Sequence, residues 1–202
     1  MRNGTGRYLR LFERVRVQSI FSTRRLSRVV FAVLFIGLLS ALSSCSREPT
    51  KGNLEIRVKD HRAAIDDFSK LEAAIDAIRL KPSGSWIELK PAQESFDLTA
   101  YTKGRFVTVF KGEIDGGPFE GIHLKLGKIG GVLKKNGAEV EVKNGVGPIQ
   151  VSLSLEPKAT TLLVIDLKVL DLSDHVGRGY ELHSNAYEIS RNGKLVDKIP
   201  PG

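Results

Sequence analysis

The sequence predicts an all-β domain, an antiparallel β-sandwich, that follows an N-terminal signal helix. Two observations indicate this fold class. Short runs of alternating apolar and polar residues recur along residues 52–199, and Gly, Pro or Asn-Gly separates them. Alternation at period two is the pattern of a half-buried strand, and about nine such runs favour two packed sheets over a βαβ fold.

The first 44 residues have the layout of a secretory signal peptide. A basic n-region covers residues 1–28 and an apolar h-region covers residues 29–42. The apolar run is short for a transmembrane helix, which needs about 20 residues to cross the hydrocarbon, and it fits a signal that is removed after export. We therefore expect an exported protein whose mature part begins near residue 45.

The end of this signal resembles the lipobox of bacterial lipoproteins. Leu42, Ser43 and Ser44 precede Cys45, which is the only cysteine of the chain. The resemblance implies cleavage before Cys45, a diacylglycerol on its thiol and an acylated amino group. Two or more acyl chains anchor a protein stably to a bilayer. The alternative is an ordinary signal peptidase cut, for instance after Ser43, with an incidental cysteine nearby.

Residues 45–51 would then be a lipidated tether, because they are short, polar and contain Pro49. The predicted location is exported and lipid-anchored, on the periplasmic or surface face of a membrane. In bacteria with two membranes an aspartate after the lipidated cysteine commonly retains lipoproteins in the inner membrane, and here that position is Ser46. The outer membrane is therefore favoured.

The charge of the mature part argues against a nucleic-acid partner. The whole chain has 31 basic and 23 acidic residues, a net charge of +8, which suggests binding to nucleic acid. Residues 1–44 contain eight of the basic residues, all arginine, and one of the acidic residues, Glu13. Residues 45–202 therefore have 23 basic and 22 acidic residues, a net charge of +1. Since the single cysteine is assigned to the lipid, stability must come from a hydrophobic core and not from disulfides.

The first strand is clear, and the segment after it is ambiguous. Leu54, Ile56 and Val58 alternate with charged residues and predict a strand. Over residues 62–79 apolar side chains recur at helical spacing, so periodicity alone predicts a helix. The alternative is a strand with Leu71, Ala73 and Ile75 on one face, a shift near Asp76, and then Ile78 and Leu80.

Turn signals separate the later strands. After the turn at residues 82–85, strand-like runs are predicted at 86–89, 96–98, 106–110, 122–126, 140–142 and 149–155. Asn136-Gly137 predicts a hairpin, because this pair accommodates a type I′ turn. Residues 160–172 form the most apolar run and are predicted to lie centrally in a sheet. The final hairpin, 180–190 with 194–199, is predicted to turn at residues 191–193.

Several loose motifs recur at positions typical of one family: Gly52-Asn53-Leu54, Asp60, Trp86 with Leu89, Asp97-Leu98, Gly117 to Leu124, and Ile165-Asp166-Leu167. On these features the chain resembles bacterial lipoprotein domains known only as a domain of unknown function, over roughly residues 52–189. It departs from them at His61-Arg62, where Ala-Pro is usual, and at Phe119, where tyrosine is common. The resemblance implies an immunoglobulin- or transthyretin-like sandwich, favours the strand over residues 69–80, and implies no activity.

The sequence contains no familiar catalytic motif. It lacks a Gly-x-Ser-x-Gly elbow, a Walker loop and a glycine-rich dinucleotide fingerprint, so serine hydrolase and nucleotide chemistry are not expected. The four histidines show no HxxxH or HExxH spacing and have no cysteine partner. A zinc site would therefore have to be assembled by the fold.

The best candidates for metal ligation are two Asp-His pairs in predicted loops, Asp60 with His61 and Asp174 with His175. The alternative is that they are solvated loop residues whose aspartates cap turns. Calcium is conceivable as a cofactor because further carboxylates lie nearby in sequence, although no EF-hand order is present. These further carboxylates are Asp66, Asp67 and Asp171. Apart from the lipid on Cys45, no cofactor is expected.

Trp86 alternates with Ile87 and Leu89, so either the indole or the aliphatic pair faces the core, and we expect a core tryptophan. If Trp86 instead lies exposed near Tyr101 or Tyr180, it would form a platform for a sugar or a peptide. Amphipathic rings supply contact area at small entropic cost.

These observations lead to a non-enzymatic, envelope-tethered binding module that contacts a protein or a glycan. One alternative is a metal-dependent enzyme or metal sensor that uses Asp60, His61, Asp174 and His175. A second alternative is a structural subunit of an envelope assembly.

Overall fold

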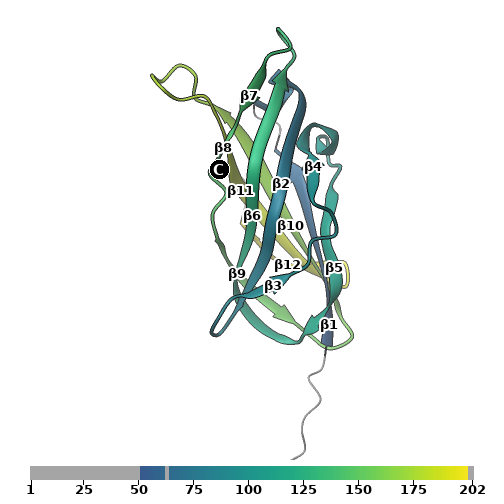
Figure 1. Cartoon of the computed structure of the whole chain (residues 1–202). Helices are drawn as coiled ribbons and strands as arrows, with labels where there is room; N and C mark the ends of the chain where they lie inside the picture. Colours follow the sequence, from purple (N-terminus) through teal and green to yellow (C-terminus); the bar gives the residue numbers. More distant parts are fainter. Residues whose placement is uncertain (1–50, 62–63, 200–202) are drawn as a thin grey trace, which may run out of the picture. The chain divides into compact units, whose positions relative to one another are not determined.

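The computed structural model describes residues 51–61 and 64–199, which form two β-sheets packed face to face (Figure 1). The predicted signal peptide, Cys45 and all of the tether except Lys51 lie outside the described residues. The elements are β1 (Lys51–Asp60), η1 (Ala64–Asp67), β2 (Phe68–Pro82), β3 (Ile87–Leu89), β4 (Ser95–Asp97), η2 (Leu98–Tyr101), β5 (Val107–Asp115), β6 (Gly117–Leu133), β7 (Glu139–Glu141), β8 (Lys143–Asn144), β9 (Ile149–Leu155), β10 (Thr160–Asp171), β11 (Tyr180–Arg191) and β12 (Lys194–Ile199).

The first sheet has the strand order β12-β11-β10-β1-β5, with β8 paired to one end of β11. β10 lies between β1 and β11, so the central position predicted for residues 160–172 is confirmed. Most neighbours are antiparallel, as predicted, but β1 pairs with β10 in parallel, and so does β8 with β11. The first sheet is therefore mixed rather than purely antiparallel.

The second sheet is built around the two longest strands, β2 and β6. Its order is β3-β2-β6-β7, with β4 paired to β2 and β9 paired to β6. All of its pairings are antiparallel. The two-layer β-sandwich predicted from the alternating runs is confirmed.

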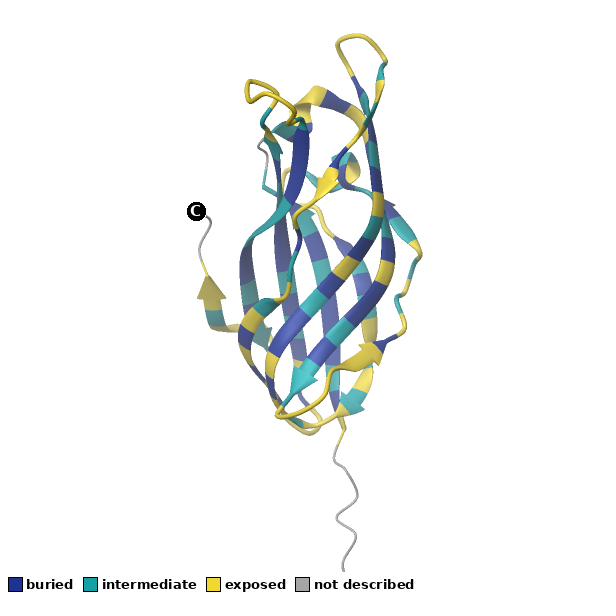
Figure 2. Ribbon diagram, turned by 60° about the vertical axis from the view of Figure 1, so that its left-hand side comes forward, coloured by how far each residue is buried: buried dark blue, intermediate teal, exposed yellow. Residues whose placement is uncertain are grey.

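The core lies between the two sheets, where the inward-facing side chains of both layers meet. Buried and exposed residues alternate along the strands, as Figure 2 shows. Fully burying an aliphatic side chain stabilises the fold by about 1.5–3 kcal/mol. The largest fully buried side chains come from both sheets and include Leu54, Ile56, Phe68, Leu71, Ile78, Leu80, Ile122, Leu124 and Leu153.

Residues 68–82 form a strand, so the helix predicted over residues 62–79 is wrong and the strand alternative is right. Only Ala64–Asp67 are helical, as one 3₁₀ turn. The register against β6 shifts where Ser69 and Asp76 are extra residues of β2. Such bulges interrupt the alternation. Phe68 and Leu71 are therefore buried three residues apart across the first bulge. Across the second bulge Ile75 and Ile78 are also three apart, with the small Ala77 buried between them. These spacings imitate a helical period.

The two Asn-Gly turns differ in conformation. Residues 135–137 do connect a hairpin, as predicted, but Asn136 does not have a positive φ, so this turn is not of type I′. Instead the Asn136 side chain accepts a hydrogen bond from the Ala138 amide at 3.1 Å. At the β11–β12 turn Asn192 has φ +48° and Gly193 has φ +79°, and positive φ at both central residues is the type I′ pattern.

One stretch of chain, residues 139–155, joins the two sheets along one side of the sandwich. β7 pairs with β6, β8 then pairs with β11 of the other sheet, and β9 returns to β6. Asn144 strengthens the crossing, since its amide nitrogen donates to the Leu126 carbonyl oxygen at 2.7 Å. This path holds β9 beside the first part of β6, residues 117–122. β9 forms part of the site described below.

Two adjacent glycines of β6 allow a test of the core packing. A Cβ on Gly131 would lie 2.4 Å from the Phe68 ring, whereas a Cβ on Gly130 would meet nothing closer than 3.9 Å. The Phe68 ring is held edge-on against Tyr180, with ring centroids 4.7 Å apart, and cannot easily move. We expect Gly131→Ala to lower the free energy of unfolding by about 1–3 kcal/mol, because it overpacks the core.

Gly130→Ala is the matched control and should change the free energy of unfolding by no more than about 0.5 kcal/mol, as surface substitutions do. Urea denaturation of both purified variants measures the difference. Equal midpoints for the two would contradict the packing of Phe68 on Gly131.

Candidate ligand-binding site

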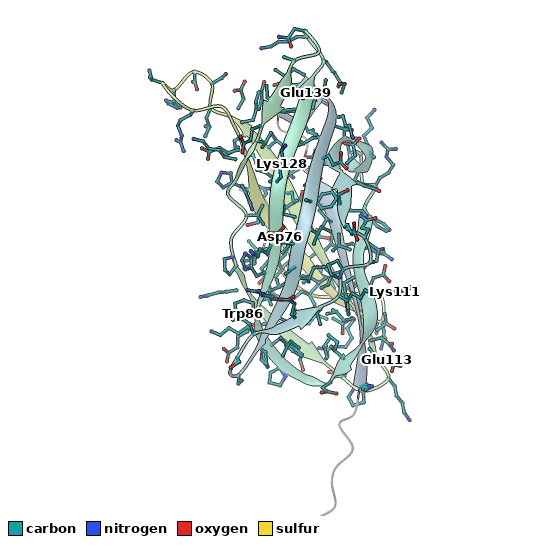
Figure 3. All side chains as sticks on the ribbon, viewed as in Figure 1. Asp76, Trp86, Lys111, Glu113, Lys128 and Glu139 are labelled. Carbon is teal, nitrogen blue, oxygen red and sulfur yellow. The ribbon has the colours of Figure 1, made fainter. Side chains whose placement is uncertain are left out.

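Trp86 lies at the start of β3, on the outer face of the second sheet. The residue after it, Ile87, pairs with Leu80 of β2. Across the sheet, Lys81 pairs with Gly121 of β6 and Gly121 pairs with Gln150 of β9. The strand order therefore brings one row of residues from β2, β6 and β9 alongside the indole. Trp86 lies toward the end of the sandwich at which β1 begins (Figures 1 and 3).

The Trp86 side chain is 40% exposed, so the predicted core position is wrong. Leu89, which belongs to the other face of the same strand, is buried in its place. The indole lies over the backbone of β6, since a Cβ on Gly121 would be only 3.3 Å from its Cη2 atom. The absence of a side chain at Gly121 lets the ring lie close to the sheet with much of its surface open to solvent.

A hollow of about 390 Å³ lies beside the indole. Its polar side chains carry an ammonium group, a carboxylate and an amide, from Lys81, Glu120 and Gln150. Its apolar lining is Trp86 with Pro148 and Ile149, next to the bare backbone of Gly121. A flat aromatic surface with hydrogen-bonding groups around it suits a ligand with an apolar face and a polar periphery.

His123 supports the indole from the sheet surface. Its ring meets the Trp86 ring edge-on, with centroids 6.3 Å apart and an interplanar angle of 61°. Burial lowers the pKa of His123 below its usual 6.5, and the positive charges of Arg79 and Lys125 lower it further, against a hydrogen bond with the Val146 backbone. At neutral pH the imidazole is therefore uncharged.

The two tyrosines considered as partners of Trp86 do not line this hollow. Tyr180 is buried, and its hydroxyl donates to the Asp67 carboxylate at 3.1 Å. Burial and this hydrogen bond raise the pKa of Tyr180 to about 12. Tyr101 ends η2 and packs against the core. The platform consists of Trp86 with the residues of β2, β6 and β9, and these two tyrosines have structural roles.

The two Asp-His pairs proposed as metal ligands are not brought together. Asp60 is buried at the end of β1, and the next residue, His61, has its Nδ1 atom 3.2 Å from Asp166 Oδ2. Asp174 and His175 are exposed in the β10–β11 loop, with His175 Nε2 3.8 Å from Asp174 Oδ1. Within residues 51–61 and 64–199, no three His, Cys, Asp or Glu side chains gather in a way that could hold a metal ion.

Two of the aspartates considered as calcium ligands accept hydrogen bonds from other residues of the domain. Asp67 accepts the Tyr180 hydroxyl, and Asp171 accepts the backbone amide of Ser173 at 2.9 Å. The Ser173 bonds lower the pKa of Asp171. Asp66 is exposed in η1. Asp171 thus caps a turn, whereas Asp67 anchors Tyr180.

Asp166 was not among the candidate residues, yet it is the partner of His61. Burial raises the pKa of the Asp166 carboxyl, against the opposing charges of Lys59 and His61. Lys59 Nζ lies 3.8 Å from Asp166 Oδ2. The alternation of β10 in the sequence places Asp166 on the outer face of this strand. The sequence does not show that His61 lies beside it, because that contact depends on the pairing of β1 with β10. We interpret this cluster as a structural ion pair.

The protonation of His123 predicts how stability depends on pH. Because its folded-state pKa is lowered, the unfolded chain binds the proton first, so the contribution of His123 to stability is present above pH 6.5 and is lost as pH falls through the folded-state pKa. We expect the free energy of unfolding of the wild type to fall more between pH 7.5 and 5.5 than that of His123→Gln. Urea denaturation at several pH values measures this, and parallel pH profiles would contradict it.

Comparison with known proteins gives a family and no function. No curated protein and no solved structure matches the chain. Within residues 51–61 and 64–199 no helix is long and apolar enough to span a bilayer. The family model described as "Domain of unknown function (DUF4382)" matches residues 51–182, from the start of β1 into β11. The chain therefore belongs to the family Domain of unknown function (DUF4382).

Proposed function

We propose that this protein is a lipid-anchored, non-enzymatic module of the bacterial cell envelope that binds a glycan at the hollow beside Trp86. The observation that carries the proposal is the exposed indole lying over Gly121, with Lys81, Glu120 and Gln150 at its edge. An indole that is open to solvent, and whose position is set by the sheet beneath it, is available to a ligand.

The chemistry of the hollow suits a sugar ring. The C–H faces of a pyranose are apolar and can stack on an indole, while its hydroxyl groups donate and accept hydrogen bonds around the ring edge. Glu120 offers acceptors, Lys81 offers donors and the Gln150 amide offers both. The indole has few rotatable bonds, so ordering it costs little entropy when a ligand binds.

The size of the site favours a glycan over a protein partner. A hollow of about 390 Å³ falls within the range of small-ligand sites, about 300–1,000 Å³. A stable protein interface covers about 800 Å² on each partner, with an apolar centre. In the described part of the chain, Trp86 is the one large exposed apolar residue that lines the hollow. The others are Ile87, Phe106 before β5, Val176 after β10, and Leu195, Val196 and Ile199 together on β12.

The anchor is the second part of the proposal. The lipobox-like segment ending at Cys45 supports lipidation, and Ser46 supports sorting to the outer membrane. Lys51 is the sixth residue after Cys45, so the chain between them spans at most about 22 Å. Trp86 lies near the end of the domain where β1 begins (Figures 1 and 3). A lipid on Cys45 would thus keep the hollow near the membrane surface, where envelope glycans are found.

Trp86 is the only tryptophan of the chain, so its fluorescence reports on the site directly. We expect neutral oligosaccharides or muramidase-released peptidoglycan fragments to change the emission in a saturable way. Calorimetry should show that Trp86→Ala lowers the affinity at least tenfold, about 1.4 kcal/mol, because the stacking surface is lost.

Phe106→Ala is the matched control, because Phe106 is a similarly exposed aromatic outside the hollow. It should bind like the wild type. If no glycan binds but a protein from the envelope does so in a Trp86-dependent manner, the module recognises a protein and the glycan proposal is wrong.

The anchor is tested by Cys45→Ser. Without the thiol no thioether can form, so the variant should stay unprocessed or leave the membrane fraction. Ser44→Ala keeps a small residue before the cysteine and should behave like the wild type. Fractionation and the mass of the N-terminal peptide measure both, and a Cys45→Ser protein that fractionates and migrates like the wild type would exclude lipidation.

A further inference from the structure

A second hollow, of about 450 Å³, adjoins the Trp86 hollow. The two share Glu120 of β6 and Gln150 of β9 in their linings, so they adjoin at these two residues. Beyond these shared residues the second hollow is lined mainly by β9 and by Pro118 and Phe119 of β6, with Tyr187 of the other sheet. The first hollow lies beside Trp86 and the second lies along Gln150 to Ser154 of β9, and we refer to the two together as the groove.

Exposed polar residues and buried residues alternate along β9, the strand that the groove follows. Gln150, Ser152 and Ser154 are exposed, while the residues between them are buried. From Gln150 to Ser154 the strand advances by about 13 Å, at about 3.3 Å per residue. Past the indole, a ligand therefore meets an amide and two hydroxyl groups at regular intervals along a straight strand.

Arg191 of β11 contacts Ser154, the last residue of β9 that lines the second hollow. Its guanidinium donates to the Ser154 carbonyl oxygen at 2.9 Å and forms an ion pair with Glu156. The charge of Arg191 is thus already matched by a carboxylate. No lysine or arginine lines the second hollow among the described residues.

The charges in the groove select against anionic ligands. Glu120 lines both hollows, and only one of its oxygens, Oε1, accepts a hydrogen bond from Ser83, at 3.4 Å. A carboxylate in the middle of the groove accepts hydrogen bonds from hydroxyl groups but repels a uronate or a sulfate. The single cation of the groove, Lys81, lies at the Trp86 end.

We infer that the two hollows form one site for a linear, uncharged oligosaccharide, with one sugar unit stacked on Trp86 and the following units hydrogen-bonded along β9. This inference rests on the proposed glycan function and adds to it the length and the charge of the ligand.

The test is calorimetry of the detergent-solubilised full chain with the dimer and hexamer of β-1,4-linked glucose and of β-1,4-linked N-acetylglucosamine, and with a galacturonate hexamer. In at least one neutral series the hexamer should bind at least tenfold more tightly than its dimer. The galacturonate hexamer should bind at least tenfold more weakly than that neutral hexamer.

Ser152→Arg fills the β9 half of the groove. In this variant the neutral hexamer should bind only as tightly as the dimer. The affinity for the dimer should be unchanged, and this unchanged affinity also shows that the variant is folded. Ser69→Arg, on an exposed position of β2 outside both hollows, is the matched control and should bind both ligands like the wild type.

Equal affinities for dimer and hexamer, or tight binding of the galacturonate hexamer, would overturn the inference while the glycan-binding function stands. If none of these saccharides, nor the peptidoglycan fragments used above, binds the wild type, both the inference and the proposed function are wrong.

Discussion

The parallel pairing of β1 with β10 is the constraint on which the rest of the sandwich depends. It places Ile56 beside Leu163 and Val58 beside Ile165 in the middle of the first sheet. Parallel neighbours cannot be joined by a tight turn. Here the chain between them first forms β2, β3 and β4 of the second sheet and then adds β5 to the free side of β1. It completes the second sheet with β6, β7 and β9, with only the short β8 placed in the first sheet, before it returns as β10. The second sheet is therefore the long crossover of this pair, and its inner face must match the apolar strip that the pair exposes.

Several residues that carry the family resemblance have structural roles in this arrangement. Asp97 accepts hydrogen bonds from the Leu71 amide and the Thr99 amide, which ties η2 to β2, and Leu98 is completely buried beside it. A Cβ on Gly52 would lie 2.9 Å from the Glu156 carbonyl oxygen, so only glycine lets the start of β1 approach the β9–β10 connection. Trp86 has no such role in the core, because its ring is exposed on the outer face. That contrast leaves the indole at the surface with no packing role in the core.

Much of the fold could be predicted from the sequence, because period-two alternation is a local property. It located β1, β9, β10 and the β11–β12 hairpin, and the apolar richness of residues 160–172 indicated the central strand. The prediction was wrong at β2, because the bulges at Ser69 and Asp76 reproduce helical spacing. Which of the two periods applies there depends on pairing with residues of β6 that lie 48 to 65 positions away in sequence (125 − 77 and 133 − 68), and the local pattern fits both.

The sequence by itself determined the class of the domain, the positions of most strands and turns, the near-neutral charge of residues 45–202, and the lipobox-like segment around Cys45. Only the tertiary structure decided that Trp86 faces outward, that Gly121 lies beneath its ring, and that His61 meets Asp166. The physical reason is that alternation says which side chains share a face of a strand but not which face is buried. That choice depends on the register of neighbouring strands, which are distant in sequence.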